Sequence, residues 1–380
     1  MTASLRVEII RDNSAWQQLA EDWDRIYHLS DATMLQSNRF LRCWWQLQGD
    51  GKSPFIVSVL ADQRLIGLVP LQLRPHKLWG KTYQLLEFMG MPHELARPTF
   101  LLPELRESAS DAVFEYLLQN RDEWDLLQLE ELVIDAPLQS ALQKFSTAGN
   151  FLMRVVPFHP CPWLDLRQSW ESYFSNLSKK MRRNIRHARN RLEKAGEFRF
   201  QVVDKPDEID AALQSYLDIE RRSWKHEEKI GVTKDEQYQC FYQELLKNYA
   251  ASGQARILLL YLDDKPVTAT ISIQDETCYY SLQITHDDAY AHYSPGTVLE
   301  SFELEALMTE AKFERYEFLG GALSNKLRWT ESQVETERVL VHKKDSRTRL
   351  FDLWFFVLKP QVKALLLRFN IKPWDWPLFR

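Results

Sequence analysis

Cysteine is scarce in this sequence, and the positions of its few cysteines exclude a cysteine-based framework. The four cysteines lie far apart and form no Cys-x-x-Cys pair: Cys43, Cys161, Cys240 and Cys278. A disulfide scaffold or a zinc site needs cysteines at close, regular spacing. The pattern therefore indicates a reducing compartment, and we expect neither disulfides nor a bound metal ion.

Long apolar runs and targeting signals are also missing. No run of 18 apolar residues occurs, and the N-terminal MTASLRVEIIRDN lacks the basic-then-apolar order of a secretion signal. We therefore expect a soluble, cytoplasmic protein. The net charge of −5 provides no overall attraction to DNA or to an anionic membrane. Any anion-binding surface must be local.

Several common catalytic motifs are absent. There is no Gly-x-Ser-x-Gly elbow, no phosphate-binding P-loop and no Gly-x-Gly-x-x-Gly, so hydrolase, NTPase and Rossmann functions lack support. His286, Asp287, Asp288 and His292 lie close together, but without the helical spacing of metal ligands. We expect them to be solvated loop residues.

The length of 380 residues favours two domains, and the two halves of the chain show the same order of expected elements. Each half begins with a strand and two helices, followed by a hairpin around Asp62-Gln63 or Asp263-Asp264. The repeated order indicates duplication of one α/β unit. Expected strands are residues 5–10, 55–60, 65–73, 126–129 and 151–157, then 198–203, 256–262, 267–274, 278–285, 316–319 and 335–343.

A strongly basic helix is expected between the halves, at residues 179–194. An apolar stripe runs along it (Met181, Ile185, Ala188, Leu192 and Ala195), and eight of its other residues are Lys or Arg against the single acid Glu193. Such a surface repels itself unless a polyanion covers it. We therefore expect Arg182 and Arg186 to contact a phosphate-rich or acidic acceptor. The alternative is neutralisation by acidic residues of a neighbouring lobe.

The C-terminal tail, residues 346–380, is aromatic and apolar, but Lys359-Pro360 interrupts it and prevents it from spanning a bilayer. We interpret it as an extension that packs on the C-terminal lobe. Interfacial contact with a membrane is the alternative, because Trp and Phe residues stand beside Lys and Arg.

Two glycine-containing turns mark the candidate site. Ser294-Pro295-Gly296-Thr297 connects an expected strand to an expected helix, where free N–H groups and the helix dipole favour an anion such as a pyrophosphate. Gly320-Gly321 ends another strand, and Lys326 and Trp329 follow it. Ligands commonly bind beyond such strand ends. Plain turns are the alternative interpretation of both segments.

The candidate acid–base residues lie around these turns. Glu220 ends an expected helix, and Trp224 could desolvate it and raise its pKa, so we expect Glu220 to be the general base. Asp287 stands behind it as the second candidate, although we expect it to be solvated and a weak base. We expect Lys326 to orient the acceptor or a phosphate. Trp224, Lys225 and Trp329 are the expected acceptor contacts.

Five segments together resemble the GNAT acyltransferase superfamily: SKKMRRNIRHARNRLEKAG, ERRSWK, PVTATISIQ, SPGTVLESFELEA and FLGGALSNKLRW. More specifically, they look like its CelD/BcsL-type branch of cellulose-biosynthesis-associated acetyltransferases, which is related to the FemAB proteins with two GNAT lobes. The resemblance covers residues 165–335, and the N-terminal half matches more loosely.

The resemblance implies an α/β fold of two tandem GNAT-like lobes, each a mixed, mostly antiparallel sheet with a central splayed strand pair between helices. The implied division is a degenerate N-terminal lobe (1–160), a linker with the basic helix (161–197), a catalytic lobe (198–345) and the tail (346–380). The co-substrate would be acetyl-CoA or another acyl-CoA, without a metal.

The implied pyrophosphate site lies at Gly296, Thr297 and Val298. The usual GNAT loop is Gln/Arg-x-x-Gly-x-Gly/Ala, so Tyr293 and Val298 occupy two of its signature positions, and Pro295 removes a backbone donor. The implied acceptor is a sugar-containing precursor or exopolysaccharide. The alternatives are aminoacyl transfer from aminoacyl-tRNA, as in FemAB proteins, and a non-catalytic scaffold. The implied location is the cytoplasm or the inner face of its membrane.

Overall fold

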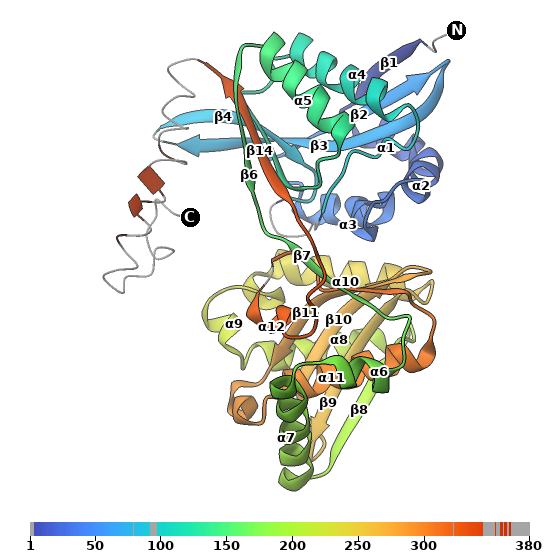
Figure 1. The fold of residues 1–380 in the computed structure, drawn as a ribbon, viewed down its shortest axis with the longest axis vertical. Coiled ribbons are helices and arrows are strands. Elements are labelled where there is room, and N and C mark those ends of the chain that lie inside the picture. Colours follow the sequence, from blue (N-terminus) through green and yellow to red (C-terminus); the bar gives the residue numbers. More distant parts are fainter. Residues whose placement is uncertain are drawn as a thin grey trace.

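The structure is a computed structural model that describes residues 4–78, 80–91, 97–321 and 323–344, and the single residues 354, 358, 359, 361, 362 and 365. The expected tail, residues 346–380, otherwise lies outside the described residues. The chain forms two lobes, each built on a seven-stranded mixed sheet with helices against it (Figure 1). This is the expected α/β architecture of two similar lobes.

The first sheet has the order β1 (Leu5–Ile10), β2 (Ser53–Ala61), β3 (Arg64–Leu78), β4 (Lys81–Phe88), β5 (Leu126–Leu132), β14 (Glu337–Lys343) and β6 (Phe151–Pro157). The second sheet has the order β13 (Gln333–Val334), β7 (Cys161–Asp165), β12 (Arg315–Glu317), β11 (Cys278–His286), β10 (Lys265–Gln274), β9 (Ala255–Leu262) and β8 (Phe198–Val203). When the second order is read from β8 to β13, it corresponds strand by strand to the first order, read from β1 to β6. This correspondence supports duplication of one unit.

The helices of the first lobe are α1 (Asn13–Gln18), α2 (Ala20–His28), α3 (Asn38–Gln48), α4 (Arg106–Gln119) and α5 (Ala136–Ala148). Those of the second are α6 (Trp170–Asn176), α7 (Lys179–Ala195), α8 (Ile209–Glu220), α9 (Trp224–Glu227), α10 (Glu236–Ala250), α11 (Pro295–Glu310) and α12 (Ser324–Leu327). Short polar side chains accept an N–H of the first turn and fix several starts: Asp12, Ser37, Asp135, Ser169, Ser178 and Asp235.

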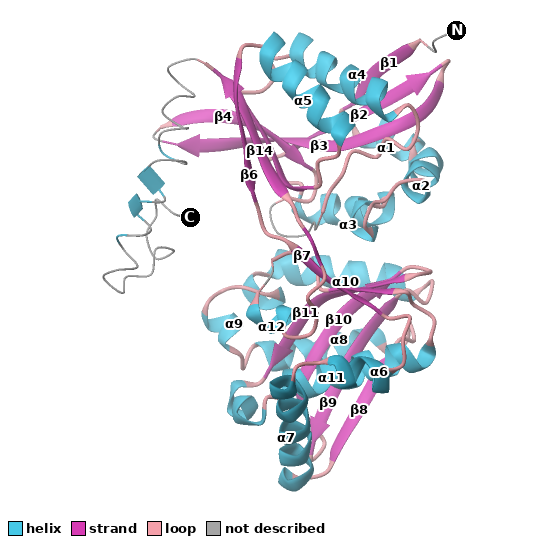
Figure 2. Cartoon of the chain, viewed as in Figure 1, coloured by secondary structure: helices cyan, strands magenta, loops and turns pink. Residues whose placement is uncertain are grey.

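Alternation along β9 separates the two faces of the second sheet. Ile257 and Leu259 pack into the core shared with α8 and α10, whereas Leu258 and Leu260 pack with α7 and α11. Successive side chains of a strand point to opposite faces, so this alternation places one helix pair on each face. The colours of Figure 2 show the resulting layers of helix and sheet. Within the described residues, no helix combines the length and apolar character needed to cross a bilayer.

The two lobes exchange one strand each. β14 comes from the C-terminal half of the chain but pairs with β5 and β6 of the first sheet, and β7 pairs with β12 and β13 of the second. The strand expected at residues 335–343 therefore forms, but in the other lobe from the one we expected. The stretch 161–197, expected to be a linker, contains β7 and the helices α6 and α7. Neither lobe is one contiguous stretch of sequence, because each sheet contains a strand from the other half of the chain.

The hairpin turns of both lobes have the same backbone form. Asp62 and Gln63 in the first lobe, and Asp263 and Asp264 in the second, have positive φ angles of 48°, 73°, 48° and 61°. Two successive left-handed residues match the right-handed twist of the adjoining strands. Both turns lie where the sequence predicts them.

Helices α3 and α10 join the lobes. Phe40 meets Phe241 edge-on with ring centroids 5.9 Å apart, and the Arg39 guanidinium lies 4.2 Å from the centroid of the Tyr249 ring. Arg39 also donates to the Ser252 hydroxyl at 2.9 Å. The apolar core consequently continues from one lobe into the other.

A buried carboxylate of the first lobe reaches the second. Glu131 lies in β5 with a left-handed φ of 54°, is 9% exposed, and its Oε2 has no hydrogen-bond partner among the described residues. Its Oε1 would lie only 2.8 Å from a Cβ at Gly320, so a larger residue at this position would require the Glu131 side chain to shift. Burial raises the pKa of Glu131 to about 7, while a hydrogen bond with the Arg97 backbone acts to lower it.

We predict that Glu131→Gln stabilises the protein at pH 8 by roughly 1–3 kcal/mol. A carboxyl group whose folded-state pKa is raised stabilises the fold below its unfolded pKa and loses that contribution as pH rises through the folded value. The advantage of the variant should therefore appear between pH 4.5 and about 7 and level off above it. Urea denaturation between pH 5 and 8.5 measures this, with the exposed Glu331→Gln as control. A difference independent of pH would contradict the assignment.

Candidate active site

Strands β11 and β12 run parallel and then part. They pair only over Cys278–Tyr280 and Arg315–Glu317, after which β12 ends and β11 continues to His286. Residues 281–286 of β11 consequently present backbone groups that no longer pair with β12. This is the splayed strand pair that the sequence resemblance implies.

A buried carboxylate holds the two strands together just before they part. Glu303 of α11 accepts hydrogen bonds from the hydroxyls of Tyr279 at 3.0 Å and Tyr316 at 2.9 Å. These tyrosines are directly paired in the strand register, and their rings stack 5.5 Å apart. Burial raises the pKa of Glu303 to about 7, against the hydrogen bonds from both tyrosines. The position of α11 is thereby fixed relative to both strands.

A cavity of about 530 Å³ opens where the strands part. Its walls come from the free part of β11, the first turns of α11, the α9 region and α12. The lining residues are Trp224, Lys225, Ile230, Ser281, Leu282, Gln283, Ile284, Thr285, His286, Ala291, Ser294, Pro295, Gly296, Thr297, Glu300, Phe318, Leu323, Asn325, Lys326 and Arg328.

A β-bulge lies in the cavity wall. Ile271 pairs with Gln283 while the next residue, Ser272, pairs with Ser281, so Leu282 has no partner in the register. A bulge of this kind locally disrupts the ladder and redirects backbone groups. The bulge lies in the middle of β11, just after the last position that pairs with β12.

The first turn of α11 forms one end of the cavity. Ser294 is left-handed with φ 56°, Pro295 has no N–H, and the N–H groups of Thr297 and Val298 donate to the Ser294 carbonyl. A Cβ at Gly296 would meet only Ile284 Cδ1, at 3.7 Å. Gly296 therefore borders open space. Its N–H, unlike those of Ser294, Thr297 and Val298, donates to no other described residue.

The expected pyrophosphate residues divide into two groups. Gly296 and Thr297 line the cavity, whereas Val298 and Tyr293 do not. Val298 is fully buried in the core between α7 and the sheet, and Tyr293 packs against the same core. Hydrophobic packing accounts for the side chains of these two residues.

Glu220, the expected base, lies outside the cavity wall. Its carboxylate is fully buried and accepts from the Tyr216 hydroxyl at 2.9 Å and the Thr233 N–H at 2.6 Å. It thereby connects the end of α8 to the loop that contains Gly231 and Thr233. This arrangement gives Glu220 a structural role and does not support its use as the base.

Asp287 is also outside the cavity, and the expectation that it is solvated is wrong. It is 2% exposed and pairs with Arg222 Nε at 2.7 Å and Lys265 Nζ at 3.1 Å. Although burial acts to raise the pKa of Asp287, the hydrogen bonds from Arg222 and Lys265 lower it overall. A buried, doubly paired carboxylate with a lowered pKa is a poor base.

The expected acceptor contacts also separate. Trp224, Lys225 and Lys326 line the cavity. Trp329 does not: it is 1% exposed, and its Nε1 donates to Glu300 Oε2 at 3.0 Å. It is therefore a support for a cavity residue and not a wall for the acceptor.

Arg182 and Arg186 lie on a different surface. They belong to a groove of about 1010 Å³ along α7, lined by Lys179, Lys180, Arg182, Arg183, Arg186, His187 and Asn190. Among the described residues, the ion pair made by α7 is that of Arg189 with Glu305, at 2.8 Å. In the part of the chain that the structure describes, an acidic group of a neighbouring helix thus neutralises one of the eight cations of α7.

The sequence analysis missed Glu300, the carboxylate that lines the cavity. It lies one turn beyond the Gly296 turn of α11 and is 7% exposed. Its Oε2 accepts from Trp329 Nε1 and, at 3.3 Å, from Arg328. Burial raises the pKa of Glu300, while the charge of Arg328 and the bond from Trp329 act against this. Its helical spacing of four residues from Gly296 was the available signal.

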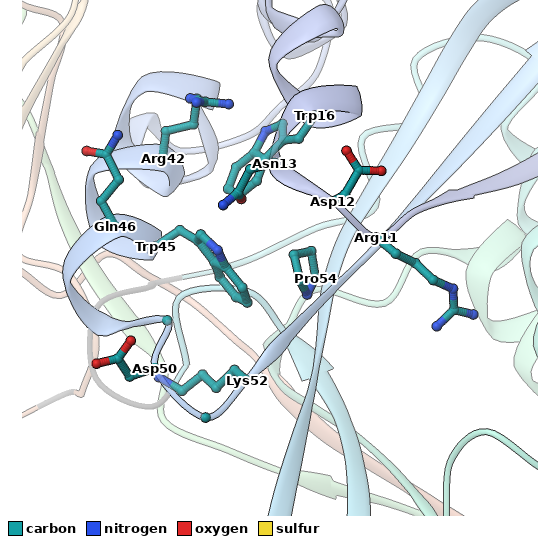
Figure 3. A pocket seen from close by; sticks show the side chains of 12 residues that line it. Arg11, Asp12, Asn13, Trp16, Arg42, Trp45, Gln46, Asp50, Lys52 and Pro54 are labelled. Atoms are coloured by element: carbon teal, nitrogen blue, oxygen red, sulfur yellow. The ribbon is translucent and has the colours of Figure 1, made fainter.

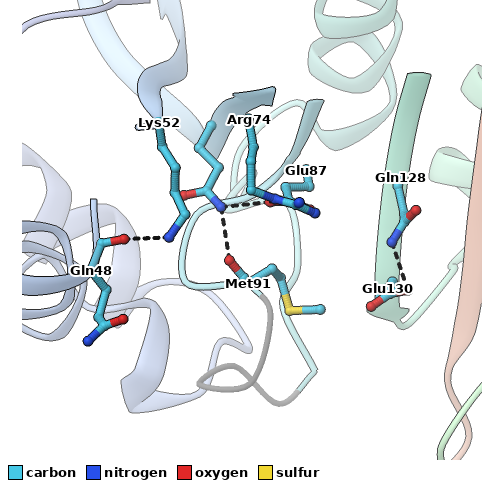
Figure 4. Close-up of polar contacts among 8 residues, drawn as sticks. Gln48, Lys52, Arg74, Glu87, Met91, Gln128 and Glu130 are labelled. Carbon is cyan, nitrogen blue, oxygen red and sulfur yellow. Dashed lines mark hydrogen bonds and ion pairs between the residues drawn. The ribbon is translucent and has the colours of Figure 1, made fainter. Parts of the chain in front are cut away.

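The strands of the first lobe that correspond to β11 and β12 are β4 and β5, which are also paired in parallel over three positions. Glu87 of β4, at the last register with β5, accepts from Gln72 at 2.9 Å and from Arg74 at 2.6 Å (Figure 4). Beyond this point Leu101 pairs with Leu68 of β3 in place of β4. A returning segment thus takes the pairing position on β3 that the continuing part of β11 takes on β10 in the second lobe.

The first lobe does have a depression, but elsewhere. It measures about 680 Å³ and lies among α1, α3 and the loop before β2, with Trp16 and Trp45 in its wall (Figure 3). None of its lining residues belongs to β4 or β5. It is therefore not a counterpart of the cavity in the second lobe. In the described part of the chain, no three His, Cys, Asp or Glu side chains gather closely enough to hold a metal ion.

Comparison with known proteins agrees with this geometry. Residues 179–355 match a family model described as an acetyltransferase (GNAT) domain, which supports a transferase activity. The matched range begins with α7, so the basic helix is part of that domain. No curated protein matches the sequence.

Three solved structures share the fold over almost their whole length. FemX is 8% identical, with 90% of this chain and 99% of that chain covered and a TM-score of 0.60. The C-terminal domain of a putative lysylphosphatidylglycerol synthetase from Agrobacterium fabrum is 10% identical (94% and 97% covered, TM-score 0.53). A tandem GNAT protein from the clavulanic acid biosynthesis pathway is 11% identical (89% and 98% covered, TM-score 0.50). The fold is that of tandem GNAT proteins.

We predict that Glu303→Ala destabilises the protein by about 2–5 kcal/mol, because it leaves two buried tyrosine hydroxyls without their acceptor and creates a void. Tyr316→Phe removes one hydrogen bond and should cost about 1–2 kcal/mol. Urea denaturation at pH 7.5 measures both. Thr309→Ala, on the exposed side of the same helix, is the control. A Glu303→Ala protein as stable as this control would disprove the role of the carboxylate.

Proposed function

We propose that the second lobe transfers an acyl group from acyl-CoA, most simply acetyl-CoA, to an amine or hydroxyl of an acceptor. The observation that carries this proposal is the cavity that joins the free edge of β11, its bulge at Leu282 and the Gly296 turn. These three features offer, in one continuous space, a strand for the pantetheine amides, donors for a thioester oxygen and a helix start for a pyrophosphate.

The donor would lie along residues 281–286, with its pyrophosphate at the Gly296 N–H and the hydroxyls of Ser294 and Thr297. Pro295 supplies no donor, so side chains take a larger share of the phosphate contacts than in a glycine-rich loop. Backbone N–H groups at the bulge would stabilise the charge that develops on the thioester oxygen.

Glu300 is the proposed general base. Among the described residues that line the cavity, Glu300 is the one with a carboxylate. Trp329 and Arg328 hold one of its oxygens in place. The acceptor nitrogen or oxygen would attack the thioester carbon and give its proton to Glu300 as the carbon–sulfur bond breaks. The departing thiolate takes a proton from water.

The resemblance to CelD/BcsL-type acetyltransferases motivates a sugar-containing precursor or exopolysaccharide as the acceptor, at the cytoplasmic face of the membrane. Aminoacyl-tRNA as the donor is the second candidate. The basic groove on α7, with Arg182 and Arg186, favours it, because a row of cations suits a phosphate-rich partner.

A direct binding comparison separates these candidates. The full chain is incubated with labelled acetyl-CoA or with labelled aminoacyl-tRNA, and retention is measured at several salt concentrations. Saturable binding of acetyl-CoA supports the first proposal. Binding of aminoacyl-tRNA alone would replace it with the second, and binding of neither would favour a scaffold.

We predict that Gly296→Val weakens acyl-CoA binding at least about 100-fold, or about 2.7 kcal/mol. The added side chain would point into open cavity space, so the fold should tolerate it while the backbone approach of a phosphate is blocked. Calorimetry with CoA measures the effect, and Ala251→Val, at an exposed position after α10, is the control. Undiminished affinity in Gly296→Val would rule out this turn as the phosphate site.

We predict that Glu300→Gln loses about two to four orders of magnitude in the chemical step, the usual contribution of a general base. Since the pKa of Glu300 is raised, wild-type turnover should fall as pH drops through that value, and this limb should vanish in the variant. Single-turnover kinetics with saturating acyl-CoA measure both. Glu220→Gln serves as the matched comparison and should keep most turnover. The opposite result, with Glu220→Gln inactive and Glu300→Gln active, would return the base to Glu220.

A further inference from the structure

Two ammonium groups in the cavity wall have no acidic partner. Lys225 Nζ lies 3.3 Å from Gln283 Oε1, and Lys326 Nζ lies 2.7 Å from the Gly320 carbonyl oxygen. Within the described part of the chain, no carboxylate forms an ion pair with either group at 4.0 Å or less. By contrast, Arg328 pairs with Glu300 in the same wall.

Such cations are costly, because no ion pair offsets their partial removal from water. Nearby acidic groups act to raise the two pKa values (Glu220 for Lys225; Cys161, Glu131 and Glu300 for Lys326), but burial outweighs them. Burial lowers the pKa of Lys225, and it lowers the pKa of Lys326 to about 8. Both lysines line the same cavity, and the charge of Lys225 also acts to lower the pKa of Lys326. An anion placed between them would offset both costs.

The same end of the cavity has an apolar rim. Trp224, Ile230 and Leu323 line the cavity and are 46%, 43% and 59% exposed. Large apolar side chains that gather at the mouth of a polar cavity are typical of a surface that an apolar ligand covers. They lie on the α9 region and beside α12, which also supply the two lysines.

We propose that the acceptor is an amphiphilic anion, whose charged group binds Lys225 and Lys326 and whose apolar portion lies on Trp224, Ile230 and Leu323. This rests on the proposed function, since it assigns the acceptor of the same cavity. The donor phosphates take the Gly296 turn, and the acceptor takes the α9 and α12 side. Glu300 lines the same cavity and is the base for the acceptor's reactive group.

Three soluble probes test the two halves of this proposal. Dihexanoyl phosphatidate has both the anion and the apolar chains, glycerol 3-phosphate has only the anion, and dihexanoyl phosphatidylcholine has the chains with no net charge. Each is titrated by calorimetry into the full chain saturated with CoA, so that the donor phosphate site is occupied.

We expect phosphatidate to bind at least 10-fold more tightly than either other probe. Lys225→Met and Lys326→Met should each weaken phosphatidate binding at least 10-fold, whereas Trp224→Ala should weaken phosphatidate and spare glycerol 3-phosphate. Lys247→Met, an exposed lysine of α10, is the matched control. Lys225→Met also covers the case in which Lys326→Met fails to fold, since Lys326 bonds backbone carbonyls.

Equal phosphatidate affinities in wild type and Lys225→Met, or equal binding of phosphatidylcholine, would overturn the inference. Loss of CoA affinity in the lysine variants would assign these cations to the donor, which also overturns it but leaves the proposed function intact. If wild type binds no CoA, the proposed function fails. The titrations on the unliganded chain then decide the anion site alone, by the same dependence on both lysines.

Discussion

The contact of Glu303 with Tyr279 and Tyr316 determines where the site can form. A carboxylate buried beneath a sheet is tolerated only with strong donors, and these two hydroxyls provide them. Because the tyrosines are directly paired one position before the last pair of β11 and β12, their shared acceptor fixes the register just before the strands part. The same contact fixes α11, so the helix presents Glu300 to the cavity and Gly296 at its end.

Parts of both halves of the chain support the strands around the cavity. β12, one wall of the splay, is covered on its far side by β7, which enters from the first half of the chain. Glu317 at the end of β12 pairs with Arg97 of the first lobe, and Glu131 packs against Gly320. The first lobe thus holds the strand and the glycine turn that bound the cavity.

The sequence predicted what local pattern determines and missed what depends on distant partners. Hairpins, amphipathic helices and the Gly296 turn follow from periodicity and turn chemistry, and they form where expected. The exchanged strand could not be predicted, because β14 has the same alternating pattern whichever sheet receives it. Likewise, nothing adjacent in sequence shows that Tyr216 and Thr233 enclose Glu220, or that Trp329 supports Glu300.

Whether one or both oxygens are bonded, more than burial, distinguishes the carboxylates of this lobe. Glu220, Asp287 and Glu303 are not among the lining residues, and both oxygens of each are bonded to groups of the fold, so their bonds hold elements together. Glu300 is held through one oxygen by Arg328 and Trp329, which leaves the rest of the group to the cavity. A base must be fixed firmly enough to be aimed and still have an oxygen for the proton it receives. In the described part of this cavity wall, Glu300 is the carboxylate that meets both conditions.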